Sequence, residues 1–470
     1  MRLGEKERVG VSRICVVGGS GYVGLGYAAV LADLGHEVVA LDLDAAKVGR
    51  LNRGECPIYE PGLPELLARL RPTGRLRFTT EYAEAVPGAA FVFLCVGTPS
   101  LSDGAADLRQ VRAAAAAVGR HLIPGGDTIV VNKSTLPVGA GDLVACLVAE
   151  HAPPGAGARV VANPEFLREG AALHDIYHPS RVVVGADPAD AQAAAAVAAL
   201  YAPFAAPTLV TDRRSAEMIK YAANAFLVAK ISFINEVAQV CERLGADVTV
   251  VAQGIGLDPR IGPLFLEAGL GFGGSCFPKD VGALAHMAEG AGIEPRLLRA
   301  VLAINGEVRR RFVARAEALL GGLDGKVVAV WGLAFKEGTD DLRAAPALEI
   351  VPMLAERGAL VRAHDPVAMA RARDLLPGVS FADTPLAAAT GADAVLVVTP
   401  WPQYRDADLG ALARAMRGDL LLDGRNLFDA AAAAEVGLRH AGVGRPTVVP
   451  RPAVGTGEAG AETADADGRG

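Results

Sequence analysis

Short, mostly apolar runs alternate along the first third of the chain with longer segments whose apolar residues recur at helical spacing. The runs are Arg13 to Val17, Glu37 to Leu41, Phe91 to Val96, Thr128 to Asn132 and Arg159 to Ala162. Runs of this length are typical of strands buried on both faces, as in parallel sheets. The pattern therefore predicts an α/β unit built on a parallel sheet.

A different pattern occupies the middle of the chain. From Asp212 to Leu244 there is neither proline nor glycine, and Gly245 follows as a stop signal. This segment predicts one uninterrupted helix of roughly 50 Å. A helix of that length suits a spine between two domains or a dimer interface.

The last third repeats the pattern of the first. A predicted strand from Lys326 to Trp331 is followed by a helix near Ala344 to Arg357 and a strand closing at Asp365. The sequence therefore predicts two Rossmann-like doubly wound domains joined by a long central helix. The expected divisions are 1–205, 206–318, 319–440 and a disordered tail at 441–470, where Gly, Pro, Ala, Thr and Glu dominate.

Composition narrows the functional classes. The 470 residues are 51% hydrophobic, but no uncharged apolar run approaches the ~20 residues that span a bilayer. The charged N-terminus does not resemble a signal peptide. Six cysteines without a CxxC pair disfavour a structural metal site and suit a reducing cytoplasm. A net charge of −7 without a basic tract makes nucleic acid an unexpected partner.

The first predicted strand leads into a glycine-rich turn. Gly19, Gly21 and Gly24 form G-x-G-x-x-G between a strand and a helix, and Asp42 ends the next strand. The first glycine makes the tight turn, the second admits a pyrophosphate, and the third lets helix and strand pack closely. Asp42 can accept hydrogen bonds from a ribose 2′-OH and would repel a 2′-phosphate. NAD is therefore predicted in preference to NADP.

Polar residues follow three later strands, at the edge where open α/β sheets bind ligands. Thr98, Thr135 and Glu165 are candidate site residues by this position, or else helix caps and turn formers. Lys220 and Asn224 lie four residues apart and share one face of the long helix. The alternative is that Lys220 reaches solvent and Asn224 is an exposed polar residue.

One further loop carries candidate chemistry in the last third. Lys336 and Arg343 lie on a loop after a strand, placed for a second phosphate-bearing ligand or simply solvated.

The segment from Gly271 to Asp280, GFGGSCFPKD, carries the strongest chemical signal. Cys276 precedes a predicted helix N-terminus, where free N–H groups and the helix dipole favour a thiolate. Lys279 adds positive charge, and Asp280 is a candidate base or water-orienting carboxylate. The alternative is a glycine-rich loop with an inert buried thiol.

Seven motifs in order resemble the UDP-glucose/GDP-mannose dehydrogenase family over roughly residues 13 to 435. They are GSGYVG (19–24), CVGTP (95–99), KST (133–135), NPEFLREG (163–170), Lys220 with Asn224, GFGGSCFPKD (271–280) and AFKEGTDDLR (334–343). The cysteine segment is most similar to members that oxidise UDP-glucose. The resemblance implies a cytoplasmic enzyme that oxidises the C6 alcohol of UDP-glucose to a carboxylate and reduces two NAD per sugar.

The resemblance also implies roles for the candidate residues. Cys276 would form a thiohemiacetal and then a thioester. Lys220 would stabilise oxyanions and Asn224 would donate a hydrogen bond. Asp280, Glu165 and Thr135 would handle protons through water.

By the same resemblance, the cofactor residues are Gly19, Gly21, Tyr22, Val23, Gly24, Asp42, Lys47, Thr98, Thr135, Glu169, Lys279 and Arg343. The substrate residues are Glu165, Phe166, Leu167, Arg168, Lys220, Asn224, Arg260, Phe265, Leu266, Glu267, Ala268, Gly269, Gly273, Lys336 and, more weakly, Arg425. Arg260 would reach a neighbouring subunit, which implies a homodimer or a higher homo-oligomer.

Three residues depart from the family pattern. Leu264 and Glu267 stand where relatives often carry basic residues, so affinity or sugar preference is in question. An extra glycine, Gly18, precedes the fingerprint, and we expect no consequence.

Other functions remain open from the residues. GDP-mannose or a UDP-N-acetylhexosamine would serve as substrates of related enzymes. A β-hydroxyacid dehydrogenase, which transfers two electrons, would not need Cys276. An NAD-binding redox sensor would use Cys276 as a switch without turnover.

Overall fold

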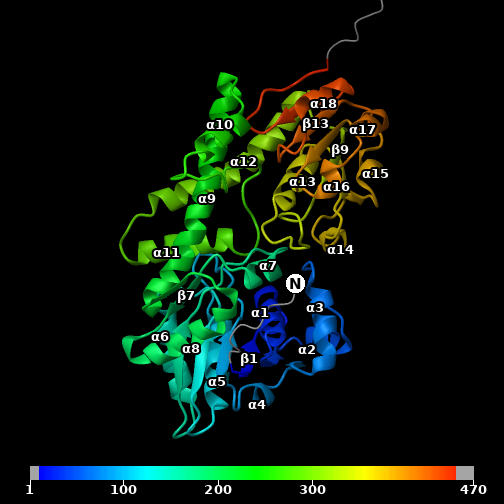
Figure 1. Cartoon of the computed structure of the whole chain (residues 1–470). Coiled ribbons are helices and arrows are strands. Elements are labelled where there is room, and N and C mark those ends of the chain that lie inside the picture. Colours follow the sequence, from blue (N-terminus) through cyan, green and yellow to red (C-terminus); the bar gives the residue numbers. More distant parts are fainter. Residues whose placement is uncertain (1–9, 451–470) are drawn as a thin grey trace, which may run out of the picture.

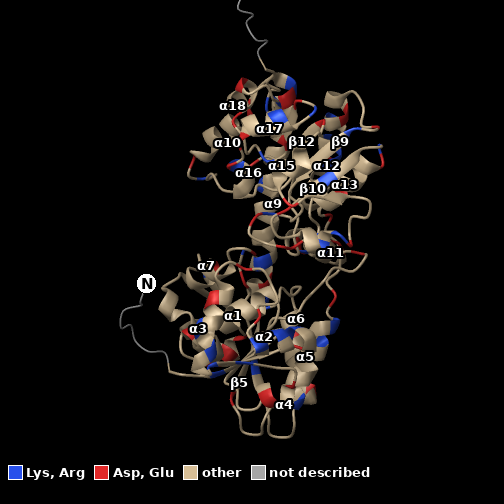
Figure 2. Ribbon diagram, turned by 90° about the vertical axis from the view of Figure 1, so that its right-hand side faces the viewer, with Lys and Arg blue, Asp and Glu red and all other residues tan. Residues whose placement is uncertain are grey.

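A computed structural model describes residues 10–450 of the chain. Two lobes, each built on a sheet, lie at opposite ends of the molecule, and helices of the middle third run from one toward the other (Figure 1). Figure 2 shows both lobes after a quarter turn, with acidic and basic segments interspersed in each.

The first lobe contains an eight-stranded sheet in the order β3-β2-β1-β4-β5-β6-β7-β8. All neighbouring strands are parallel except β6 and β7. The strands are β1 (Arg13–Val17), β2 (Glu37–Leu41), β3 (Leu76–Thr79), β4 (Phe91–Leu94), β5 (Thr128–Asn132), β6 (Ala158–Ala162), β7 (Val182–Gly185) and β8 (Thr208–Thr211).

Helices cover both faces of this sheet, as a doubly wound fold requires. One face packs on α1 (Tyr22–Asp33), α3 (Leu63–Leu70), α7 (Ala172–Tyr177) and α8 (Ala191–Leu200). The other packs on α4 (Tyr82–Ala85), α5 (Arg109–Arg120) and α6 (Ala140–His151). Helix α2 (Ala45–Arg53) follows β2, and short 3-10 turns lie at Arg71–Thr73, Pro188–Asp190 and Ala202–Phe204.

The long central helix agrees closely with the sequence expectation. Helix α9 (Arg213–Leu244) has 32 residues, which span about 48 Å. The Asp212 side chain accepts a hydrogen bond from Ser215 N at its start, and Gly245 takes a left-handed conformation at its end. It packs against α10 (Val248–Gly256), α11 (Phe277–Gly290) and α12 (Arg296–Leu320).

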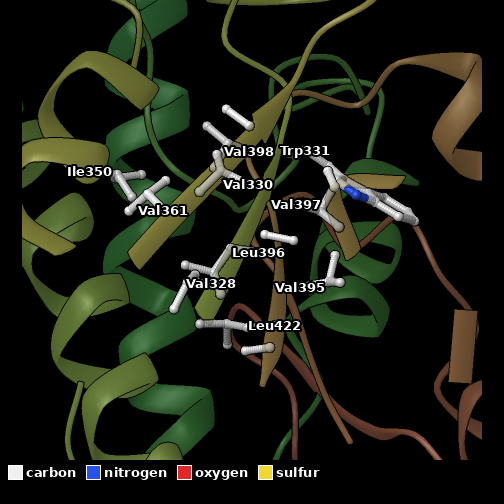
Figure 3. Packing of buried hydrophobic residues seen from close by; sticks show 14 of the residues in the cluster. Val328, Val330, Trp331, Ile350, Val361, Val395, Leu396, Val397, Val398 and Leu422 are labelled. Atoms are coloured by element: carbon white, nitrogen blue, oxygen red, sulfur yellow. The ribbon is translucent and has the colours of Figure 1, made fainter. Parts of the chain in front are cut away.

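The second lobe has a six-stranded, fully parallel sheet in the order β11-β10-β9-β12-β13-β14. Apolar side chains such as Val330, Leu396 and Leu422 fill its core (Figure 3). The strands are β9 (Val327–Trp331), β10 (Leu360–His364), β11 (Ser380–Phe381), β12 (Ala394–Val397), β13 (Leu420–Asp423) and β14 (Arg439–Gly442). The helices are α13 (Ala347–Ala355), α14 (Met369–Ala372), α15 (Pro385–Ala389), α16 (Pro402–Arg405), α17 (Leu409–Ala415) and α18 (Ala430–Glu435).

Three boundary predictions were wrong. The strand expected to reach Val96 ends at Leu94, since the chain turns toward the ligand edge there. The helix expected from Ala344 begins at Ala347, because Ala344 has a positive φ of 49°. The tail expected from residue 441 is ordered up to residue 450.

The ordered end of the chain is held by hydrogen bonds and one ion pair. Residues 441 and 442 belong to β14, and His440 bridges Val448. Arg445 Nε lies 3.1 Å from Asp247 Oδ2, and Gly444 N donates to Glu242 Oε1. This segment therefore ties the second lobe to the end of α9 and the start of α10. The rest of the predicted tail, 451–470, lies outside the described residues.

Candidate active site

The turn after β1 is packed too closely for any residue but glycine at two of its positions. A Cβ on Gly24 would lie 2.2 Å from Gly18 O, and one on Gly19 would lie 2.7 Å from Ala40 Cβ. A Cβ on Gly21 would lie no closer than 3.6 Å to any other atom, which leaves room for a ligand.

The extra glycine also matters, contrary to our expectation. Gly18 has φ +80°, and a Cβ there would lie 2.6 Å from the backbone oxygen of Cys95. Any other residue at this position would push the cofactor turn away from β4.

These features fit a dinucleotide. Helix α1 starts at Gly21 without a side-chain cap, so its first N–H groups are free to bind a pyrophosphate. Asp42 lies at the end of β2, where its Oδ2 accepts hydrogen bonds from Ser20 N and from Ser20 Oγ, at 3.1 Å and 2.6 Å. Lys47, on α2, lies 3.5 Å from Asp44.

Tyr22, in contrast, reaches the other lobe. Its hydroxyl donates to Asp340 Oδ1 over 2.6 Å. The fingerprint turn is thus tied directly to the loop after β9.

The second lobe also has an acidic residue after its second strand, and backbone N–H groups of that lobe bind its carboxylate. Asp365 follows β10 as Asp42 follows β2, and it is fully buried. Its Oδ2 accepts hydrogen bonds from the backbone N–H groups of Leu333 and Ala334, at 2.7 and 3.0 Å. Asp42 also accepts backbone hydrogen bonds, but it remains partly exposed, whereas Asp365 has no exposed surface with which to accept a ribose hydroxyl.

Lys220 is buried and paired, so the alternative in which it reaches solvent is wrong. It projects from α9, its side chain is 3% exposed, and its Nζ lies 2.8 Å from Glu165 Oε1. Burial opposes its charge, but Glu165, Cys276 and Asp280 outweigh this and raise the pKa of Lys220. Burial acts against the charge of Glu165 as well, yet Lys220 and the N–H of Leu167 lower its pKa. The site therefore contains a charged lysine shielded from water.

Asn224 and Asp280 form the neighbouring part of the site. Asn224 Nδ2 donates to Asp280 Oδ2 over 2.6 Å, and Lys279 Nζ donates to Asp280 Oδ1 over 2.5 Å. Asp280 has no exposed surface. Lys279 also lies 3.4 Å from Thr98 Oγ1, which donates to Thr135 O. Strand ends of the first lobe are thereby connected to α11.

Cys276 stands at the N-terminal cap of α11, as expected, but its thiol is not ionised as we expected. Burial and the carboxylates of Glu165 and Asp280 raise its pKa to about 11, against a lowering by Lys220 and Ser275. The helix N-terminus was visible in the sequence. Asp280 lies in the same motif and was visible too, whereas Glu165 comes from a distant segment and its approach to the sulfur was not.

Some of these groups line a cavity of about 610 Å³, whereas others lie behind its wall: Glu165, Asp280, Lys279 and Thr98. Cys276, Lys220, Asn224 and Gly273 line it, together with Phe265, Lys336 and the segment from Phe166 to Glu169. Leu264 also faces it. Thr135 instead lines a separate space of about 10 Å³, which Lys220 also borders.

The remaining predicted substrate residues lie outside this cavity. Leu266 and Ala268 are buried against α9 and α10, Gly269 N donates to Asn235 of α9, and Glu267 is exposed. Arg425 donates to the backbone oxygens of Val398 and Gly271. The Arg260 side chain is 88% exposed and pairs with Asp258.

Lys336 and Arg343 occupy different surroundings on their loop. Lys336 faces the cavity, and burial lowers its pKa. Arg343 pairs with Asp341 over 2.7 Å and lies 3.4 Å from Glu169. The solvated-loop alternative is therefore wrong for Lys336, whereas Arg343 remains half exposed.

Sequence reasoning missed several residues that line the cavity. Lys133 is buried, donates to Asn163 Oδ1 and to the Tyr201 hydroxyl at 3.0 Å each, and lies over the Tyr27 ring. Arg181 stacks on Phe166. The only available signal was the position of Lys133 in the KST motif.

The described part of the chain has neither a metal-binding cluster nor a membrane-spanning helix. Residues 10–450 hold no group of three or more His, Cys, Asp or Glu side chains placed to bind a metal ion. Over the same range, every helix is too short or too polar to cross a membrane.

Comparison with known proteins agrees with this architecture. The NAD binding domain of the UDP-glucose/GDP-mannose dehydrogenase family matches residues 12–205, its central domain 214–307 and its UDP binding domain 329–430. The UDP-glucose 6-dehydrogenase YwqF of Bacillus subtilis is 44% identical over 93% of this chain and 98% of its own. The UDP-glucose 6-dehydrogenase of Rhizobium meliloti is 45% identical over 91% and 98%.

Solved structures give the same result. A UDP-glucose dehydrogenase from Pyrobaculum islandicum matches with a TM-score of 0.87 and 44% identity, over 94% of this chain and all of the other. A UDP-D-ManNAc dehydrogenase from Pyrococcus horikoshii matches with a TM-score of 0.80 and 28% identity, over 92% and 99%. Three matching domains in order and relatives more than 40% identical over nearly the whole chain lead to one conclusion: the chain belongs to the UDP-glucose/GDP-mannose dehydrogenase family.

Proposed function

We propose that this protein oxidises the C6 alcohol of UDP-glucose to the carboxylate of UDP-glucuronate, with two NAD reduced per sugar. The observation that carries the proposal is that the Cys276 thiol and a buried, charged Lys220 line one cavity large enough for a nucleotide sugar. Relatives named as UDP-glucose 6-dehydrogenases support UDP-glucose as the substrate.

Bound NAD supplies the acceptor for the hydride lost in each of the two oxidation steps. The fingerprint turn, Asp42, Lys47 and Thr98 would hold it beside Cys276. Glu169, Lys279 and Arg343 would complete that side of the site.

Lys220 stabilises negative charge on the substrate oxygen. As the alcohol loses its proton, the ammonium of Lys220 is close enough to the cavity to stabilise the alkoxide. Glu165 keeps the lysine charged and holds its Nζ in place over 2.8 Å. Asn224 donates to the same oxygen, and Asp280 fixes the amide in the donating orientation.

Loss of the first hydride turns the alkoxide into an aldehyde. Cys276 then captures this aldehyde. Its sulfur bonds to the carbonyl carbon, the thiol proton is lost, and the oxygen gains a proton, which gives a thiohemiacetal. Loss of the second hydride from the carbon and of the proton from the hydroxyl leaves a thioester. Water adds to the thioester carbon, the C–S bond breaks, and the sulfur regains a proton. Glu165, Thr135 and Asp280 would orient water and move its protons.

The remaining assignments are part of the same proposal. Phe265 to Gly269, Lys336 and Arg425 would bind the nucleotide as the lobes close. Arg260, exposed on its own subunit, would contact the partner's substrate in a homodimer or larger assembly. We also propose that the enzyme works in the cytoplasm.

The decisive measurement is the NADH yield per sugar, with product identification by mass. Two NADH per UDP-glucose and a mass gain of fourteen, the replacement of two hydrogens by one oxygen, are expected. One NADH per sugar would contradict the thioester route and favour a two-electron dehydrogenase. A preference for GDP-mannose or a UDP-N-acetylhexosamine in the same screen would correct the substrate, and no turnover at all would favour a redox sensor.

A further inference from the structure

The proposed reaction needs the Cys276 thiol to lose a proton, yet the site holds that proton tightly. Burial, Glu165 and Asp280 raise the pKa of Cys276 to about 11, so at neutral pH the sulfur is protonated. Asp280 and Glu165 each have their carboxylate engaged by a lysine. A different base must accept the thiol proton.

Ser275 and Glu169 lie in line with the sulfur. Ser275 Oγ is 3.5 Å from Cys276 Sγ, a distance at which a thiol can donate to a hydroxyl oxygen. The same Oγ donates to Glu169 Oε1 over 2.7 Å. Because the Ser275 hydroxyl uses its one hydrogen to donate to Glu169, its contact with the sulfur is one in which the thiol donates, and the three groups form a continuous chain toward the carboxylate.

The surroundings of Glu169 make it a base suited to neutral pH. Its side chain is 14% exposed. Burial and the neighbouring Asp341 raise the pKa of Glu169 to about 7, while Ser275 and Arg343 act in the opposite direction. A general base is most useful when its pKa lies near the working pH.

We propose that Ser275 and Glu169 form a proton relay that deprotonates Cys276 as it attacks the aldehyde. The thiol proton passes to Ser275 Oγ, and the Ser275 hydroxyl proton passes to Glu169 Oε1. Sulfur keeps its electron pair and bonds to the carbonyl carbon. When the thioester is hydrolysed, the same path returns one proton from Glu169 to the leaving sulfur, so the relay is restored.

The two pKa values determine the timing. The pKa of the thiol lies well above that of the carboxyl, so complete transfer before attack is unfavourable. The proton therefore moves as the carbon–sulfur bond forms. This inference rests on the proposed role of Cys276, and it adds a proton-transfer role to Glu169, which the resemblance assigns to cofactor binding.

The test is the rate at which iodoacetamide alkylates Cys276 in the ligand-free protein between pH 5.5 and 9.5, followed by peptide mass spectrometry. In the natural protein we expect the rate to rise with a midpoint near pH 7, where Glu169 ionises, far below the ionisation of the thiol itself. Ser275→Ala and Glu169→Gln should remove this step and slow alkylation at pH 8 by at least about tenfold. Cys146, which is exposed, reports in the same sample on the reagent, and Cys15, which is buried, stays unlabelled while the protein is folded.

A third variant tests the electrostatics. Asp341→Asn removes a negative charge that raises the pKa of Glu169, so the midpoint should move to lower pH without loss of the step. A purely structural role for these residues would not produce such a shift.

Two results would overturn the relay: a natural protein without a step near pH 7, or variants that keep its rate and pH profile. Alkylation uses neither NAD nor a sugar, so this outcome is independent of the NADH yield. A yield of one NADH would defeat the proposed function and leave the relay standing.

Discussion

Replacing Lys220 with methionine tests what the buried ion pair contributes to the stability of the fold and what it contributes to turnover. The Nζ and Oε1 atoms are 2.8 Å apart, with side chains 3% and 6% exposed. At an effective dielectric constant of about 20 their attraction is about 6 kcal/mol, part of which offsets the cost of burying two charges. Lys220→Met leaves Glu165 buried without its cation. We expect the free energy of unfolding to fall by about 3–5 kcal/mol and kcat to fall by about 10²–10³.

The loss of stability should depend on pH with a defined sign. In the natural protein the pKa of Glu165 is lowered, so its stabilising effect is present above the unfolded pKa and is lost as pH falls through the folded value. Without Lys220, burial raises that pKa, and protonation relieves the unpaired charge. The stability deficit should therefore shrink as the solution is acidified.

A double variant provides the control. Urea denaturation measures stability, and NADH absorbance measures kcat. Lys220→Met with Glu165→Gln should recover stability, because no unpaired charge remains, but it should not recover turnover. An active Lys220→Met enzyme, or a double variant that regains activity, would refute the electrostatic role of the lysine.

Three further changes test other parts of the site. Cys276→Ala should abolish acid formation while NAD affinity, measured by fluorescence titration, stays near normal; continued carboxylate production would rule out the thioester. Asp42→Ala should weaken the preference for NAD over NADP in kcat/KM, whereas Ser20→Ala, which removes one structural partner of Asp42, should leave that preference unchanged. Gly24→Ala places a Cβ 2.2 Å from Gly18 O, so it should cost about 3 kcal/mol in urea denaturation and weaken NAD binding; a neutral effect would contradict the close packing of this turn.

Much of the fold was predictable because local signals bound each element. The strands at Arg13 and Thr128 were expected over the residues they occupy, since an apolar run is followed directly by polar or glycine-rich turns. Helix α9 is bounded by Asp212 and Gly245, which are recognisable from sequence alone. The edge strand β8 was missed, because its four residues contain an apolar run of only two, Leu209 and Val210.

Most residues of the site could be predicted from the sequence, but their protonation states could not. Motifs identified Cys276 and Lys220, but the protonation of the thiol depends on its burial and on Glu165, which lies in a segment far away along the chain. Gly18 was undervalued for a similar reason, because the atom that forbids a side chain there belongs to Cys95. Long-range contacts of this kind leave no periodicity in the chain.

The hydrogen bond from Tyr22 to Asp340 has a consequence for how turnover proceeds. If two dinucleotides serve one sugar, the spent molecule must be exchanged while the acylated intermediate stays in place. On the dinucleotide side the lobes meet through small polar contacts, Tyr22 with Asp340 and Arg343 with Glu169. Arg343 is about half exposed, and surface contacts of this kind are weak. The lobes can therefore part along this seam in mid-reaction, while the buried residues around the sulfur keep the unfinished product shielded from bulk water.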